Sequence, residues 1–118
     1  MLTRVSVPTR RPGTGDAMEG ITLGAHGTYV VSAAATVGPD GVRVALGCVA
    51  AVPVRAVAME QALAGGDLSA QAVKAAAAGL GASLDPPSDV HASADYRRHL
   101  AEVSAVRAVL RAAERAKG

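Results

Sequence analysis

The segment Thr28-Tyr-Val-Val-Ser-Ala-Ala-Ala-Thr-Val-Gly-Pro-Asp-Gly-Val-Arg-Val-Ala-Leu-Gly-Cys48 decides the fold, because it predicts a β-hairpin. Its central Gly38-Pro-Asp-Gly41 is a strong turn signal, since proline presets the first central position and glycine tolerates positive φ. On both sides of the turn, apolar residues recur at every second position, as in a strand with one buried face. That predicted face carries Tyr29, Val31, Ala33, Ala35, Val37, Val42, Val44, Leu46 and Cys48. We therefore expect Cys48 to be a small buried hydrophobe.

The residues before the hairpin predict one more short strand and then a loop. Val5 and Val7 are in phase within Leu2–Val7, and Pro8 ends this run because proline cannot donate to a β-ladder. Glycine, proline and scattered charges in the segment 9–20 are typical of a mobile loop.

After the hairpin the pattern predicts three helices. A short helix over Val57–Leu63 ends at Gly65-Gly66, and the next begins at its N-cap Ser69 and ends near Gly79–Gly81. A rigid linker, Asp85-Pro-Pro-Ser88, separates these two helices from the last and longest one.

The last helix is predicted to begin after the cap residue Ser93 and to bury one stripe of side chains. The stripe consists of Tyr96, Leu100, Val103, Val106 or Arg107, and Leu110. If the ring of Tyr96 belongs to the core, its replacement by alanine should cost about 3 kcal/mol of stability. Together these elements predict an α+β fold, an antiparallel three-stranded β-sheet with three helices packed on one face, in a single domain spanning 1–118.

Composition narrows the classes of function. The chain has 118 residues, half of them hydrophobic, with no Trp or Phe and only two Tyr, so its core must be built from Ala, Val and Leu. The net charge of +2 is small and aromatic stacking platforms are nearly absent, which argues against nucleic-acid binding. No signal peptide and no membrane-spanning run is recognisable, so we expect a cytoplasmic protein without membrane contact. The single cysteine and three dispersed histidines predict neither a disulfide nor a metal site.

Spaced motifs in the second half of the chain resemble a known family. They are Gly41-Val-Arg-Val-Ala-Leu-Gly-Cys-Val49, Pro53-Val-Arg-Ala56, Glu60-Gln-Ala-Leu-Ala-Gly65, and the run from Ser88 to Leu110 with its Tyr96-Arg97 pair. In this order they resemble the C-terminal domain of the FAD-binding (medium) subunit of molybdenum hydroxylases, the carbon monoxide dehydrogenase and xanthine dehydrogenase flavoproteins. The resemblance covers roughly residues 2–113 and implies the same α+β architecture.

The resemblance also implies where flavin would be held. In the family, FAD is bound mainly by a larger preceding portion with glycine-rich phosphate loops, and no such loop is recognisable here. We therefore expect no cofactor in this chain itself and FAD only through a separate partner. The segment Leu23–Tyr29 departs from the arginine-rich family pattern, and Cys48 stands where the family usually has a second glycine.

Four residues are candidates for acid/base chemistry. His26, between two glycines at the strand entrance, has the residue type that titrates near neutral pH, and Tyr29 is close by in sequence. Asp89 and Glu60 are carboxylates that could take part in catalysis. The structural alternatives are an ordinary exposed His26, a pairing of Asp89 with Arg97 or backbone amides, and a pairing of Glu60 with Arg55.

Three functions fit these observations. The main hypothesis is a stand-alone, cofactor-free domain, with Met1 directly before its first strand, that binds a small apolar metabolite in a sheet/helix cleft and acts as an isomerase or cyclase. A related possibility is a stand-alone interaction module without catalysis. The alternative is an interaction subunit of a split FAD-dependent molybdenum hydroxylase, docked on a flavoprotein or molybdenum-hydroxylase partner subunit. In either setting we expect a homo-oligomer, most simply a homodimer, because an uncovered Ala/Val surface favours self-association.

Overall fold

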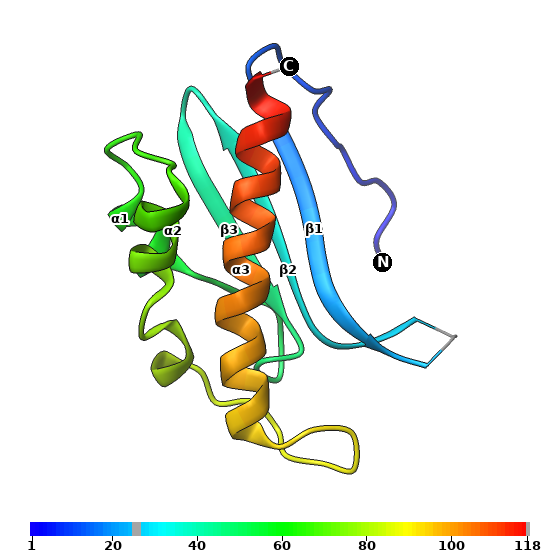
Figure 1. Cartoon of the computed structure of the whole chain (residues 1–118). Coiled ribbons are helices and arrows are strands. Elements are labelled where there is room, and N and C mark those ends of the chain that lie inside the picture. Colours follow the sequence, from blue (N-terminus) through cyan, green and yellow to red (C-terminus); the bar gives the residue numbers. More distant parts are fainter. Residues whose placement is uncertain (25–26, 118) are drawn as a thin grey trace.

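The computed structural model describes residues 1–24 and 27–117 and contains one antiparallel sheet flanked by helices (Figure 1). Its strands are β1 Gly15–Leu23, β2 Thr28–Gly38, β3 Gly41–Gly47 and β4 Val54–Arg55, in the spatial order β1-β2-β3-β4. The helices are α1 Val57–Ala62, α2 Ala70–Ala77 and α3 Ala94–Lys117, with a short 3-10 helix η1 at Leu80–Ser83. The predicted combination of an antiparallel sheet with three helices is confirmed.

The hairpin of β2 and β3 forms where the sequence predicts it. Val37 pairs with Val42 and Gly38 with Gly41, so Pro39 and Asp40 alone form the turn. Gly41 has a φ of 111°, a conformation that side chains rarely adopt, which explains the glycine at this position.

The sheet has four strands, not the predicted three, and its first strand lies elsewhere. Residues 2–7 are exposed and form no strand, whereas β1 occupies much of the segment 9–20 that was predicted to be a loop. β1 forms because it pairs with nearly the whole of β2 and because α3 packs on it. At Gly15 a side chain would collide with the backbone of Ala112, so the glycine permits this close approach.

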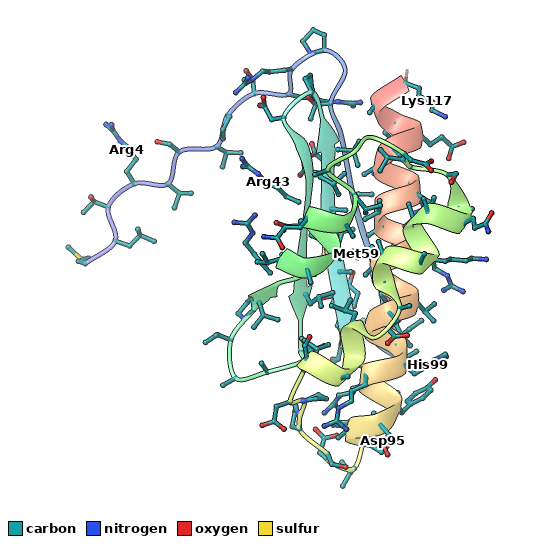
Figure 2. All side chains as sticks on the ribbon, turned by 90° about the vertical axis from the view of Figure 1, so that its left-hand side faces the viewer. Arg4, Arg43, Met59, Asp95, His99 and Lys117 are labelled. Atoms are coloured by element: carbon teal, nitrogen blue, oxygen red, sulfur yellow. The ribbon has the colours of Figure 1, made fainter. Side chains whose placement is uncertain are left out.

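One face of the sheet is covered by α3, which runs along β1 and β2 (Figures 1 and 2). The helix residues in this contact are mostly small, which lets the helix axis come close to the sheet. Those that are completely buried are Ala101, Ala105, Ala108, Val109 and Ala112. Of the stripe predicted from the larger side chains, Leu100 is buried as expected and Val103, Val106 and Leu110 are half-buried, but Tyr96 is 51% exposed rather than part of the core.

The remaining helices pack beside α3 and at the β3 edge, where Met59 of α1 and Val73 of α2 join the core. Both predicted caps are present. The hydroxyl of Ser69 accepts a hydrogen bond from the Ala72 amide (3.2 Å), and that of Ser93 accepts one from the Tyr96 amide (3.1 Å). Within the described part of the chain, no helix is long and apolar enough to cross a membrane.

Cys48 differs from its prediction. It is exposed, and it has a φ of 65°, in the left-handed region that non-glycine residues avoid. The chain leaves β3 at this point and bends away, so the alternation of the strand no longer applies and the sulfur does not enter the core.

Candidate functional site

Glu60 connects helix α1 to the sheet. Its side chain is 9% exposed, and its Oε1 accepts hydrogen bonds from the Val44 amide of β3 (2.9 Å) and from Arg55 Nε (3.2 Å). The second carboxylate oxygen accepts a 2.6 Å hydrogen bond from the Arg55 guanidinium. The pairing of Glu60 with Arg55, the structural alternative in the sequence interpretation, is therefore present.

These contacts fix the ionisation of Glu60. Burial by itself would raise the pKa of this carboxyl group, but the hydrogen bonds from Arg55 and the Val44 amide, with the charges of Arg55 and Arg43, outweigh it. The pKa of Glu60 consequently lies below its ordinary value. The hydrogen bond to Glu60 raises the pKa of Arg55, so the pair remains ionised at neutral pH.

Asp89 and Arg97 form a second cluster, in the loop before α3. Arg97 is 5% exposed and donates to both carboxylate oxygens of Asp89 (3.2 Å each) and to the carbonyl of Pro87 (2.7 Å). Asp89 also accepts the amides of His91 (2.9 Å) and Ala92 (3.2 Å). The first of these amide bonds is the largest cause that lowers the pKa of Asp89, and it outweighs the opposing effect of burial. The predicted pairing of Asp89 with Arg97 is thus present, and it shapes the loop.

Tyr29 is placed by an irregularity in β2. The β1–β2 register shifts between Ile21 and Thr22, so that Tyr29 no longer shares the face of Val31 as the simple alternation predicts. Its ring lies instead against Gly20, where an added Cβ would come within 2.8 Å of two ring carbons. An aromatic ring over a cross-strand glycine stabilises a sheet. His26 lies outside the described residues.

The described candidates do not share a cavity. Tyr29 lies at the start of β2, Glu60 on α1 and Asp89 in the loop before α3 (Figure 1). Two surface hollows have volumes of about 660 Å³ and 410 Å³, and none of these three residues lines either one. The smaller hollow lies at the C-terminal end of α3, next to Leu68 and Ala113. Among residues 1–24 and 27–117, no group of three His, Cys, Asp or Glu side chains is placed to hold a metal ion.

A surface that the sequence interpretation missed lies on the side of the sheet away from α3. We call it the open face, and it is formed by Asp16, Met18, Gly20, Ser32, Ala34, Thr36, Arg43, Ala45 and Gly47. These residues alternate with the buried ones along the three long strands, and all of them are exposed or half-buried. Such small residues give no hydrophobic signal in a sequence, although their alternation with Val and Ala would place them together.

Comparison with known proteins identifies what this arrangement resembles. The family profile of the CO dehydrogenase flavoprotein C-terminal domain matches residues 25–112. No curated protein is significantly similar to the chain.

Solved structures with the same fold include carbon monoxide dehydrogenases and a quinoline 2-oxidoreductase. Carbon monoxide dehydrogenase from Hydrogenophaga pseudoflava has 32% identity and a TM-score of 0.84 over 92% of this chain. The reconstituted CO dehydrogenase from Oligotropha carboxidovorans has 29% identity and a TM-score of 0.82, also over 92%. Quinoline 2-oxidoreductase from Pseudomonas putida 86 has 27% identity and a TM-score of 0.82 over 91%. The present chain spans only about 40% of the length of these matched chains.

Proposed function

Because this chain belongs to the CO dehydrogenase flavoprotein C-terminal domain family, we propose that it is the docking domain of a molybdenum-hydroxylase flavoprotein. In this function it packs against an FAD-binding portion and contributes to an oxidoreductase complex without a catalytic group of its own. The proposal corresponds to the alternative in the sequence interpretation, an interaction subunit that meets FAD only through its partner.

One observation supports the proposal above the others. The fold matches over 92% of this chain but only 40% of the Hydrogenophaga chain, so more than half of that relative has no counterpart here. In a flavoprotein the phosphates of the cofactor need a loop that presents several backbone amides, and the flavin supplies the redox chemistry. We infer that both come from the portion that this chain docks on.

The polar clusters also fit a docking domain. Glu60 and Asp89 are each held by an arginine and by backbone amides, which are contacts that fix the shape of a surface. A general base needs a lone pair that is free to reach a substrate proton. The acid/base roles of His26, Tyr29, Asp89 and Glu60 nevertheless stay a prediction, as does the homodimer, and no observation favours an isomerase or cyclase.

Flavin binding tests the proposal. The purified chain should be colourless and should show no saturable FAD binding at micromolar concentrations. We would then replace the matched region of the Hydrogenophaga chain with residues 1–118 and assemble the enzyme with its other subunits. This chimera should retain stoichiometric FAD through gel filtration, like the parent enzyme prepared in parallel. Stoichiometric FAD on the isolated chain, or a chimera that loses its flavin, would contradict the proposal.

A further inference from the structure

The open face is built from cross-strand rows of small residues, and the ring of Tyr29 lies against Gly20 at one end of it. Gly20, Ser32 and Gly47 are neighbours in register, and the next row contains Met18, Ala34 and Ala45. At Gly47 an added Cβ would come within 2.5 Å of the Ser32 hydroxyl, so a side chain there would require Ser32 to move. Besides the Tyr29 ring, 41% exposed, Met18 is the large apolar side chain in these rows and is 54% exposed. A surface of this kind permits the backbone of another protein segment to approach closely.

The N-terminal arm, residues 1–9, leaves the domain on the same side. In Figure 2 α3 lies on one side of the sheet, and the arm, with Arg4 near its end, extends away on the opposite side. Its apolar side chains are almost fully exposed, with Leu2 at 80%, Val5 at 71% and Val7 at 80%. An exposed apolar segment next to an uncovered sheet face is typical of an interaction surface.

The larger hollow, of about 660 Å³, lies between the arm, the segment 10–14, the β2–β3 turn and one end of the open face. Val7 of the arm and Arg11 of the segment 10–14 line it on one side, and Asp16, Thr36 and Arg43 line it from the sheet. The hollow is therefore a concave site at one end of the open face, into which a side chain of a partner would fit.

The charges in this hollow favour an acidic group. The Asp16 carboxylate already accepts a 2.8 Å hydrogen bond from the Thr36 hydroxyl, and Arg10 donates to the carbonyls of Thr14 and Arg115. Arg11 has only a long contact with Asp40, 3.9 Å between two highly exposed side chains, which is worth little in water. Arg43 is exposed and makes no ion pair within the described residues. Two guanidinium groups are thus available to bind a carboxylate.

We propose that the open face, together with the N-terminal arm and the hollow between them, is where the FAD-binding portion of the flavoprotein docks. This inference rests on the proposed function and specifies its interface. The partner presents a small, apolar surface to the rows around Ala34 and an acidic side chain to Arg11 and Arg43. The choice of occupant rests on the part of the relatives that has no counterpart here, and the choice of face on α3, which already covers the other side of the sheet.

Cysteine labelling in the chimera described above tests this interface directly. Ala34→Cys places a thiol at the centre of the open face, and Ala75→Cys places one on the exposed surface of α2 as the matched control. Peptide-resolved mass spectrometry separates both from the native thiol of Cys48. If nine of ten molecules are docked, maleimide should label Ala34→Cys about tenfold more slowly in the chimera than in the isolated chain. The rate for Ala75→Cys should be the same in both.

The outcomes distinguish the two proposals. A chimera without FAD contradicts the proposed function. A chimera that retains FAD but labels Ala34→Cys as fast as the isolated chain overturns the interface and leaves the proposed function standing. Protection of Ala34→Cys already in the isolated chain, together with a dimer mass in sedimentation, would also overturn it, because a second copy would then be the occupant.

A charge reversal tests the acidic contact. Arg43→Glu should lower the FAD retained by the chimera and restore fast labelling of Ala34→Cys, whereas Arg107→Glu, on the exposed side of α3, should change neither. Circular dichroism of both isolated variants checks that the domain still folds. Unchanged flavin and unchanged labelling in a folded Arg43→Glu chimera would contradict the acidic contact.

Discussion

At the scale of single residues, Cys48 has a strained backbone conformation that lowers the stability of the domain and that a glycine would relieve. Its φ of 65° brings Cβ close to the following carbonyl group, an arrangement that costs roughly 1–2 kcal/mol in a non-glycine residue. The resemblance of the motif Gly41–Val49 to the family predicts glycine at this position. Exposure of the sulfur means that nothing in the core depends on it.

Cys48→Gly should therefore stabilise the domain. After the greater flexibility of glycine in the unfolded chain is subtracted, we expect a gain of about 0.5–1 kcal/mol in the free energy of unfolding. Urea denaturation measures it, with Cys48→Ala as the control, because alanine removes the sulfur but keeps the strained Cβ. Equal stability of the two variants would show that the left-handed conformation is not the cause.

Replacement of Arg97 and of its neighbour Tyr96 by alanine should have very different effects on stability. Arg97 is buried and holds the loop through the Pro87 carbonyl and Asp89, so Arg97→Ala should cost about 2–3 kcal/mol, the usual effect of hydrogen bonds to charged groups. Tyr96→Ala should change stability by no more than about 0.5 kcal/mol, not the 3 kcal/mol expected of a core residue, because half of Tyr96 is in contact with water. Thermal unfolding of both variants measures these losses. A larger loss for Tyr96→Ala would contradict the position of Tyr96 outside the buried side of α3.

The low pKa of Glu60 predicts how the domain responds to acid. A carboxyl group whose pKa is lower in the folded than in the unfolded chain stabilises the fold above its unfolded pKa of about 4.3. This contribution disappears as the pH falls through the lower, folded value. The difference in unfolding free energy between the wild type and Glu60→Gln should accordingly be constant near neutral pH and shrink below about pH 4. A difference that is independent of pH down to the acid transition would show that Glu60 is not ionised in this contact.

At the scale of elements, structure that depends on local residues, such as turns and helix caps, was predicted well. Structure that depends on contacts between distant segments was not. The hairpin follows from a turn of four residues and a two-residue alternation, and Ser69 and Ser93 cap the helices where their hydroxyls can reach the first free amides. β1 has no comparable pattern. It is a strand because β2 offers a ladder and α3 offers a surface, whereas Leu2–Val7 alternates but meets no partner strand.

The same distinction applies to the candidate site. The pairings of Glu60 with Arg55 and of Asp89 with Arg97 could be predicted because the residues are close in sequence and of opposite charge. The exposed side of the sheet was missed because glycine, alanine and serine are weak hydrophobes, although their alternation with the buried residues places them on one face. In α3 the small residues mattered for the opposite reason: they are the buried ones, and the larger side chains that define a sequence stripe lie beside them.

The close packing of α3 should make its alanine face intolerant of larger side chains. Ala108 is completely buried between helix and sheet, so Ala108→Leu forces the two apart and should cost about 1–3 kcal/mol. The neighbouring exposed residue provides the control, since Arg107→Leu adds an apolar side chain without entering the contact. Chemical denaturation compares the two. A neutral Ala108→Leu would mean that the interface contains space that the structure does not show.

At the scale of the whole molecule, the core is built from alanine and valine, and one large face of the sheet is uncovered. Small side chains bury little apolar area each, and a chain of this size gains limited stability from its own core. A partner that covers the open face adds stability through binding, because it binds the folded domain and not the unfolded chain. The proposed function therefore predicts a gain in the stability of the folded domain when it docks on its partner.

Thermal unfolding of the grafted domain measures this gain in stability most directly. Hydrogen exchange followed by mass spectrometry can report the melting of α3 separately in the isolated chain and in the chimeric Hydrogenophaga enzyme. If the domain docks on the FAD-binding portion, α3 should melt at a clearly higher temperature in the chimera, and the Arg43→Glu chimera should lose most of this increase. If α3 melts at the same temperature in the chimera as in the isolated chain, the domain is only tethered, and the docking function is contradicted.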